Sequence, residues 1–355
     1  MADSYYQIAT TPKLYVSYPL YQYASGALDE YLSMNVNWDS EGDMIKLLQI
    51  DPSNQVNIAF QNPFETNDSA LLAYKIVPSF DDETLVASSG LWNFDFCMLL
   101  GHNFNTQGIK FNFSSATQDT NTYIETSNIV NYVNDSVPEY DGWSLINLNS
   151  TASDEERYFI FRLILDENSA SECNLGSLLF GKSFEFPINT SLSTTTKFEY
   201  GIKQKSTISG KTISTANWTK PNNWITEPFG LGNQEGDNYQ RRSGRRVWKM
   251  QFDSLAPDKV MNQNMMMNSN GFTAQDNHST AADSVESLYN INDATDFYTN
   301  VVHRSMSSHL PMVLQIDKND NSPSNFAIVR MNKDYTIKQK SPNLYSISVT
   351  LTEQI

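Results

Sequence analysis

The strongest constraint on the fold is a strict alternation of apolar and polar side chains in the C-terminal half. In RRVWKMQFDSL, apolar Trp248, Met250 and Phe252 alternate with polar residues, and LYSISVTLTEQI near residue 350 follows the same rule. Successive side chains of a strand point to opposite faces, so a period of two predicts half-buried antiparallel strands. The apolar runs PMVLQID and FAIVRMN predict further core strands.

The N-terminal half carries its own strand patterns. WNFDFCMLLGHN (92–103) and IKFNF (109–113) alternate in the same way, whereas RYFIFRLILDE (157–167) is an almost continuous apolar run. A continuous run is typical of a strand covered on both faces, as in the core of a sandwich. Gly181, inside SLLFGKSFEFP, predicts a bend or bulge. These segments together predict a β-sandwich.

A turn-rich segment, FPINTSLSTTT (186–196), divides the chain. We therefore predict a β-sandwich over residues 1–188 and a second antiparallel β domain over residues 189–355. In the second domain, Phe297 and Val301 fall on one side of a helical period and Thr295 is a candidate N-cap, which predicts a helix near residues 294–307. The predicted fold class is mostly β, with one or two helices in the C-terminal domain.

Charge and composition exclude several classes of partner. The formal net charge is −16, which disfavours non-specific binding to nucleic acid and to anionic membranes. No stretch approaches the roughly 18 apolar residues of a membrane span, and residues 1–16 do not read as a secretory signal, so we expect expression in a cytoplasm. The two cysteines, Cys97 and Cys173, are interpreted as buried thiols, with a single disulfide as the alternative.

Motifs for catalysis and metal binding are missing from the sequence. The four histidines have no zinc-site spacing, and no nucleophile elbow or phosphate-binding loop is present. We therefore predict no catalysis, no metal and no cofactor. A glycosidase-type pair such as Asp81 or Asp82 with Glu83 stays open as an alternative. His102, at a strand end beside Gly101, favours a structural role over a ligand contact.

Two groups of side chains are candidate contact residues. Four arginines in QRRSGRRVW reverse the acidic character locally and predict an inter-subunit contact with an acidic patch, rather than an anion site or a solvated turn. These arginines are Arg241, Arg242, Arg245 and Arg246. Aromatic residues near turn signals predict contact with a glycan or a protein partner. They are Tyr140, Trp143, Trp218 and Trp224.

A succession of segments resembles the tail-associated structural proteins of marine tailed bacteriophages. GSLLFGKSFEFP is followed by TKFEYGIKQKSTISGKTISTANWTKPNNW, by RRSGRRVWKMQFDSL and by FAIVRMNKDYTIKQKSPNLYSISVTL. Gly244, Arg245, Arg246 and Trp248 match a G-R-R-x-W strand of that family, and LLGHN at residues 99–103 resembles one of its strand ends. The resemblance covers most of residues 175–355 and only thinly the rest.

The resemblance implies a ring-forming or hub-binding β domain, preceded by a jelly-roll-like or carbohydrate-binding sandwich. It implies a virion structural protein of the tail tip or baseplate, assembled in the host cytoplasm without catalysis. The implied partners are copies of the chain itself, in a hexameric or trimeric ring, and other tail proteins. A carbohydrate-binding adhesin for host attachment is the alternative, and a glycan hydrolase or lyase is a third reading.

Overall fold

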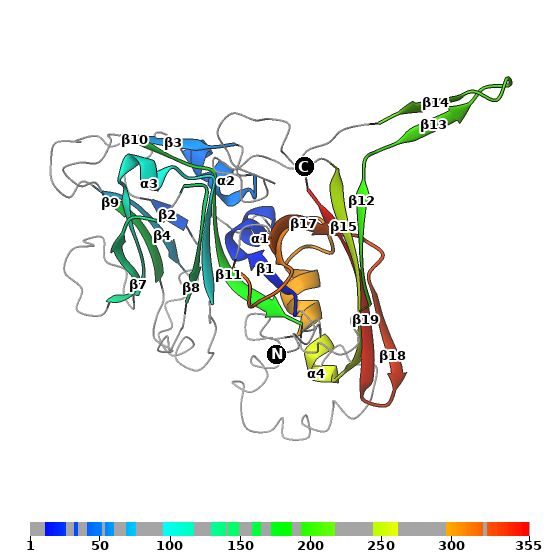
Figure 1. Cartoon of the computed structure of the whole chain (residues 1–355). Coiled ribbons are helices and arrows are strands. Elements are labelled where there is room, and N and C mark those ends of the chain that lie inside the picture. Colours follow the sequence, from blue (N-terminus) through cyan, green and yellow to red (C-terminus); the bar gives the residue numbers. More distant parts are fainter. Residues whose placement is uncertain are drawn as a thin grey trace, which may run out of the picture.

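The structure is a computed structural model that describes most of the chain. The described residues are 11–25, 32–34, 41–51, 54–59, 69–75, 95–116, 129–139, 141–148, 158–164, 172–186, 193–216, 244–261, 296–321 and 325–354. Within them the fold is mostly β and its strand pairs are antiparallel, as the alternating patterns predict (Figure 1).

A ten-stranded sheet runs through the whole molecule (Figure 1). Its path in spatial order is β12 (Ser193–Glu199), β15 (Arg245–Leu255), β19 (Leu344–Glu353), β17 (Phe326–Met331), β16 (Met312–Gln315), β1 (Lys13–Ser17), β11 (Ser177–Glu185), β5 (Phe96–Leu100) and β8 (Trp143–Asn147). The tenth strand, β18 (Thr336–Ser341), pairs with β19 beside this path.

A second layer of five strands packs against one end of that sheet. Its order is β2 (Leu32–Met34), β4 (Ser69–Lys75), β9 (Tyr158–Ile164), β6 (Lys110–Ala116) and β7 (Ile129–Ser136). Phe113 and Phe161 of this layer share a core with Leu99 and Phe180 of the large sheet. Two sheets that enclose a common apolar core form a β-sandwich, so this part of the predicted fold is confirmed.

Strand β1 pairs with strands from both predicted domains, residues 1–188 and residues 189–355. Leu14 is paired with Phe184 of β11 on one side and with Leu314 of β16 on the other. The two predicted domains therefore share one hydrogen-bonded sheet, and the chain is not divided there into separate β units. Strands β11 and β12, which flank the turn-rich segment in the sequence, belong to this sheet but are separated in it by β15, β19, β17, β16 and β1.

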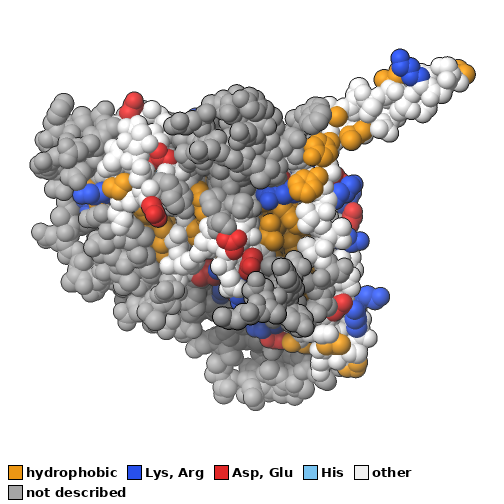
Figure 2. Space-filling view, in the orientation of Figure 1, with side chains coloured by type: hydrophobic (Ala, Val, Ile, Leu, Met, Phe, Trp, Pro, Cys, Tyr) orange, Lys and Arg blue, Asp and Glu red, His pale blue; other side chains and the backbone are white. Residues whose placement is uncertain are grey.

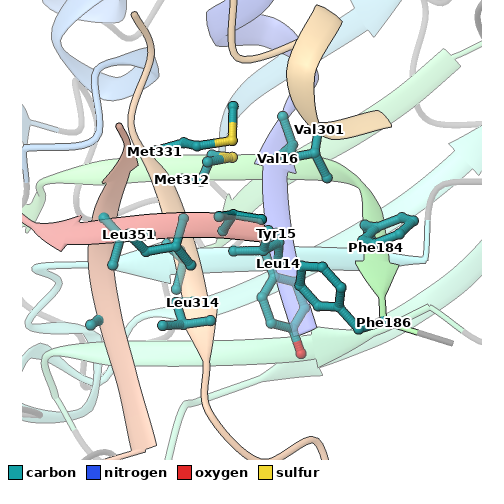
Figure 3. Packing of buried hydrophobic residues seen from close by; sticks show 14 of the residues in the cluster. Leu14, Tyr15, Val16, Phe184, Phe186, Val301, Met312, Leu314, Met331 and Leu351 are labelled. Carbon is teal, nitrogen blue, oxygen red and sulfur yellow. The ribbon is translucent and has the colours of Figure 1, made fainter. Parts of the chain in front are cut away.

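The C-terminal core lies between the curved sheet and a short helix. Figure 3 shows apolar side chains from β1, β11, β16, β17, β19 and the helix meeting in one cluster. Within the cluster, Phe186 stacks on Phe252 with ring centroids 3.9 Å apart. Phe297, beside the helix, packs edge-on against Phe184 at 5.6 Å. The helix thus fills the concave side of the sheet.

This helix confirms the helical segment predicted near 294–307, but its geometry differs. Residues Tyr298–His303 form a π-helix, and Asp296 Oδ1 accepts a hydrogen bond from the Thr299 amide at 2.8 Å. Asp296 therefore provides the side-chain cap, and the predicted cap Thr295 lies outside the described residues. The α-helices are α1 (Tyr18–Ser25), α2 (Glu41–Leu48), α3 (Phe104–Gln107) and α4 (Pro257–Val260).

Gly181 marks a close approach inside β11. A Cβ atom at this position would lie 2.4 Å from the Tyr18 ring and 2.5 Å from the Val16 carbonyl oxygen. Only glycine lets α1 and β1 pack this closely onto β11, which is the physical basis of the irregularity predicted there.

Candidate assembly interface

A long β-hairpin leaves the body of the protein (Figure 1). Among the described strands, β13 (Lys203–Ser206) and β14 (Thr212–Thr215) pair only with each other, and a turn closed by a hydrogen bond from the Gly210 amide to the Thr207 carbonyl connects them. Every residue from 201 to 216 is exposed, including Ile208 at the tip. We call residues 201–216 the arm. A two-stranded hairpin without an apolar face to bury is at best marginally stable in water, so the arm is a candidate for docking onto a partner.

The two faces of the arm differ in charge. Lys203 lies opposite Thr215, and Lys205 lies opposite Ile213, so both lysines and Ile213 share one face. The opposite face carries Gln204, paired with Ser214, and other uncharged residues. Residues 201–216 contain three lysines and no acidic residue. The arm therefore has a cationic face with an exposed apolar residue within it.

The outer face of the sheet next to the arm is also basic. The registers of β12, β15, β17, β18 and β19 place their outward side chains on one surface. The charged side chains of this surface, which we call the basic face, are Lys197, Glu199, Arg245, Lys249, Asp253, Arg330, Lys338 and Lys340. Figure 2 shows Lys and Arg side chains along this edge of the molecule and on the arm.

Charge is thus segregated in this protein. The basic face holds six cations and two anions, a net of +4, and the arm adds +3, giving +7. With a formal net charge of −16 for the whole chain, the remainder carries −16 − 7 = −23. The arm and the basic face are therefore basic parts of a chain that is acidic as a whole.

The two acidic residues of the basic face are paired within it. Asp253 forms an ion pair with Lys340, whose hydrogen bond lowers the pKa of the Asp253 carboxyl. Glu199 lies 3.3 Å from Lys197 and 3.5 Å from Arg245. Lys249, Arg330 and Lys338 are exposed and form no ion pair with another described residue. The face keeps cations that are available to a partner.

The predicted arginine cluster divides between surface and core. Arg245 is on the basic face, with its side chain 41% exposed, which agrees with a contact role. Arg246 points the other way: its guanidinium lies 2.8 Å from Glu353 and donates to the Phe326 carbonyl oxygen at 3.2 Å. The prediction of an inter-subunit contact is therefore wrong for Arg246, because alternation places it on the buried side of β15. Arg241 and Arg242 lie outside the described residues.

Of the four aromatic residues predicted to contact a glycan or partner, Trp143 lies within the described residues, and it is buried. Trp143 is the first residue of β8, is 3% exposed and packs on Phe326 with ring centroids 4.6 Å apart. A ring buried in this way cannot stack on a glycan, so the prediction for Trp143 is wrong. Tyr140, Trp218 and Trp224, like the carboxylates Asp81, Asp82 and Glu83, lie outside the described residues.

A polar pocket of about 430 Å³ opens where five neighbouring strands of the large sheet end. It is lined by Lys13, Tyr15, Asp95, Asn147, Leu148, Glu185, Gln315, Lys318, Asn319 and Asn321. The Tyr15 hydroxyl donates to Gln315 Oε1 at 2.6 Å, and Gln315 Nε2 donates to Asn321 Oδ1 at 3.1 Å. The sequence has no local signal for this pocket, because its residues come from strands that are far apart in the chain and become neighbours only in the sheet.

Two groups of the pocket, Asp95 and Tyr15, have raised pKa values. Burial raises the pKa of the Asp95 carboxyl, and the hydrogen bonds that it accepts from the Ser183 amide and hydroxyl oppose this shift. Burial and the nearby carboxylates of Asp95 and Glu185 raise the pKa of the Tyr15 phenol. The pocket therefore offers amide, carboxylate and ammonium groups that suit a small polar ligand.

His102 has the structural role that the sequence favours. It is fully buried, stacks on Phe104 and shares a hydrogen bond of 3.0 Å with Ser144 Oγ. Burial lowers its pKa to about 4.

Cys97 and Cys173 are buried free thiols, so the alternative of a disulfide between them is wrong. Burial raises the pKa of both thiols.

In the part of the chain that the structure describes, no three His, Cys, Asp or Glu side chains come together as a metal site, and no helix is long and apolar enough to cross a membrane. No protein-family model matches the chain, and no curated protein matches its sequence.

Proposed function

We propose that this chain is a non-enzymatic structural subunit that works by packing into a multi-chain assembly. The observation that carries the proposal is the arm, in which every side chain from residue 201 to residue 216 is exposed. Ordering a chain costs conformational free energy, which burial normally offsets. In the arm that burial has to come from a partner, because the hairpin pairs only with itself among the described residues.

The assembly that we propose is the tail tip or baseplate of a tailed bacteriophage, with copies of the chain and other tail proteins as partners. The support is the family resemblance of the strand succession, including Gly244, Arg245 and Trp248, together with the β-rich architecture. The protein acts mechanically, through backbone pairing and interfaces of at least about 1,000 Å².

The assembly role is tested by comparing the solution mass of the full chain with that of a variant in which residues 201–216 are replaced by a short Gly-Ser turn. We expect the full chain, of 40.2 kDa per copy, to form oligomers and the slightly lighter variant to remain a folded monomer. Light scattering gives the mass, and circular dichroism controls for folding. Equal masses for both proteins at all concentrations would reject the arm as the assembly element.

The tail location needs a separate test. An antibody against the purified chain should label one end of the tail in negative-stain images of phage particles from cells that carry the gene. Labelling of the capsid, or of no particle, would reject this placement and leave the assembly role standing.

A second candidate function is binding of a host-surface glycan, and the polar pocket is the observation that favours it. Its amide side chains, such as Asn147 and Asn321, suit sugar hydroxyl groups. Binding on a glycan panel should fall for Asn147→Ala and persist for Asn57→Ala, a change of an exposed residue on β3 (Val56–Ala59), which pairs with β10 (Glu172–Leu175). Equal binding by both variants would exclude the pocket.

A further inference from the structure

We propose that the outer edge of β12 is a docking site for an extended segment of a different protein, in which acidic and apolar side chains alternate. The segment adds to the large sheet as a further strand, which is a common way for a protein to bind a peptide. The inference rests on the proposed assembly function. It adds a contact element outside the arm and the chemistry of the partner that fits this element.

Strand β12 lies at one end of the large sheet (Figure 1). Within the described part of the chain it pairs with β15 and with no other strand, so the backbone N–H and C=O groups on its far side have no strand partner there. Residues 194–198 are all exposed. An edge of this kind is a template for hydrogen bonds with an incoming strand.

The composition of β12 leaves its edge poorly protected. Proteins commonly guard an edge strand with lysine, with proline or with a β-bulge. Strand β18, which pairs only with β19 among the described strands, has Lys338 and Lys340, and its register with β19 shifts between Gln339 and Ser341. By contrast, β12 has three consecutive threonines and a single lysine, and its register with β15 is regular throughout. Because threonine favours a pleated strand, β12 suits strand addition better than β18 does.

Phe198 shows that the inner side of the sheet is incompletely covered at β12. It lies opposite Arg246, and Thr196 lies opposite Trp248, so both β12 side chains project to the buried side of the sheet. Phe198 is nevertheless 48% exposed. Among the described residues six large apolar side chains are exposed, and four of them lie between residues 198 and 213. Figure 2 shows hydrophobic side chains where the arm leaves the body. Apolar side chains of a strand beside β12 would cover Phe198.

The outer side of β12 is cationic. The register of β12 with β15 places Lys197, Arg245 and Lys249 on the basic face near the open edge. Glu199 forms ion pairs with Lys197 and Arg245, whereas Lys249 has no ion pair with another described residue. Carboxylates on the outward side of an incoming strand therefore meet positive charge. Because side chains alternate along a strand, the partner has acidic residues at every second position and apolar residues between them.

A second copy of the chain fits this edge less well than an acidic strand does. Two β12 strands paired about a two-fold axis would continue the sheet with both basic faces on the same side. Lys197, Arg245 and Lys249 of each copy would then lie near their counterparts, and like charges in contact are unfavourable. An acidic segment of another protein has no such cost.

The main test is the binding of a fluorescein-labelled peptide of about nine alternating glutamates and valines, long enough to span β12, measured by fluorescence anisotropy with the full chain. A peptide with the same residues in two blocks should bind at least about tenfold more weakly, because it cannot separate charge from apolar groups by face. N-methylation of either the valines or the glutamates removes the N–H donors from one edge of the peptide.

One of these two methylated peptides should lose at least about tenfold in affinity and the other should keep it, because a single edge of the peptide faces β12. Equal binding by the two methylated peptides would overturn the proposal, since no backbone ladder then forms. Failure of the alternating peptide to bind with saturation up to about 200 μM chain would overturn it as well.

Variants of the chain locate the bound peptide. Lys197→Glu should weaken binding about fivefold and Phe198→Ser about tenfold. Lys259→Glu on α4 and Val137→Ser after β7 are the matched controls, and both should bind like the unchanged chain. All four side chains are exposed, so circular dichroism should show the same fold for every variant. Losses at the controls as large as those at β12 would overturn the site.

The arm separates this inference from the proposed function. The chain with residues 201–216 replaced keeps β12, which ends at Glu199, so it should bind the alternating peptide like the unchanged chain. Loss of the peptide from this variant would place the contact on the arm and overturn the β12 site. If arm-dependent oligomers form but the peptide does not bind, the docking edge fails and the assembly function stands. Peptide binding by a chain that stays monomeric would support the edge and reject the arm as the assembly element.

Discussion

Arg246 and Glu353 form a buried ion pair between β15 and β19, with Nη2 and Oε1 2.8 Å apart and side chains only 10% and 2% exposed. The Glu353 carboxylate also accepts the Arg246 backbone amide at 2.9 Å, and the guanidinium lies 4.7 Å from the Trp248 ring. Removing one partner leaves a buried charge without compensation, which is far more costly than losing an exposed pair.

We therefore expect Arg246→Met to lower the free energy of unfolding by about 3–5 kcal/mol. Urea unfolding followed by tryptophan fluorescence measures the change. Arg245→Met is the matched control, because that side chain is 41% exposed and should change stability by less than about 0.5 kcal/mol. The double variant Arg246→Met with Glu353→Leu should be more stable than Arg246→Met alone. Equal losses at Arg245 and Arg246 would contradict the buried pair.

Gly181→Ala should destabilise the fold by about 1–3 kcal/mol, because the added methyl group meets the Tyr18 ring and the Val16 carbonyl. Gly210→Ala provides the contrast, since a Cβ there meets no atom within 4 Å and the residue lies in the arm turn. An alanine at the positive φ of 80° found here would strain the hairpin turn alone, so the stability of the whole fold should not change. Thermal unfolding of both variants measures the two losses of stability. A loss for Gly210→Ala as large as that for Gly181→Ala would contradict the close approach at Gly181.

Trp143→Ala should lower stability by about 3–5 kcal/mol, because it leaves a cavity beside Phe326. Trp143→Phe should lose much less, since a smaller aromatic ring keeps the contact. Denaturant unfolding gives both values. If the alanine variant is as stable as the unchanged chain, Trp143 is not in the core as described.

His102 should make stability depend on pH. Its pKa is about 4 in the fold, against an ordinary value of 6.5, so the unfolded chain binds more protons in this range. The contribution of the neutral imidazole is therefore complete above pH 6.5 and is lost as the pH falls toward 4, by on the order of 3 kcal/mol. The charge of Asp141 acts in the opposite direction but is the weaker influence.

Other groups titrate in the same range, so the His102 effect is measured as a difference. Burial raises the pKa of Asp95 and of Asp296, whose protonated forms favour the fold at low pH. Urea midpoints from about pH 7 to about pH 4 for the unchanged chain and for His102→Gln separate these contributions. The urea midpoint of His102→Gln should fall less between pH 7 and pH 4 than that of the unchanged chain. Parallel midpoint curves for the two proteins would contradict a buried neutral His102.

Local patterns predicted the strands well because alternation depends only on neighbouring residues. The apolar faces of β15 and β19 follow the sequence period, with Trp248 and Ile347 both buried. Which strands pair is not a local property: β1 and β16 join residues about 300 positions apart, whereas the boundary at residues 188 and 189 is predicted from a turn-rich segment alone. Chain order alone does not show which strands become neighbours.

For the candidate contact residues, too, local patterns do not reveal the partners that are distant in the sequence. Alternation along β15 places Arg246 on the buried side with Trp248, whereas the carboxylate that pairs with it, Glu353, lies 107 positions away in the sequence. The arm had a local signal, because KQKSTISGKTIST alternates lysine with small polar residues and offers no apolar face to a core. At the start of the helix, Phe297 packs against Phe184 and Phe186, and these contacts cannot be read from the helical period of residues 294–307.

The central position of β1 also affects how the protein is made. The Tyr15 hydroxyl bonds to Gln315, so one edge of β1 has to wait until residues 312–315 leave the ribosome. Until then a nascent chain holds an unpaired strand edge, the kind of surface that recruits chaperones or other nascent chains. A chain cut before residue 312 would keep that edge open. The edge of β1 that faces β16 is therefore paired only in a chain that extends at least to residue 315.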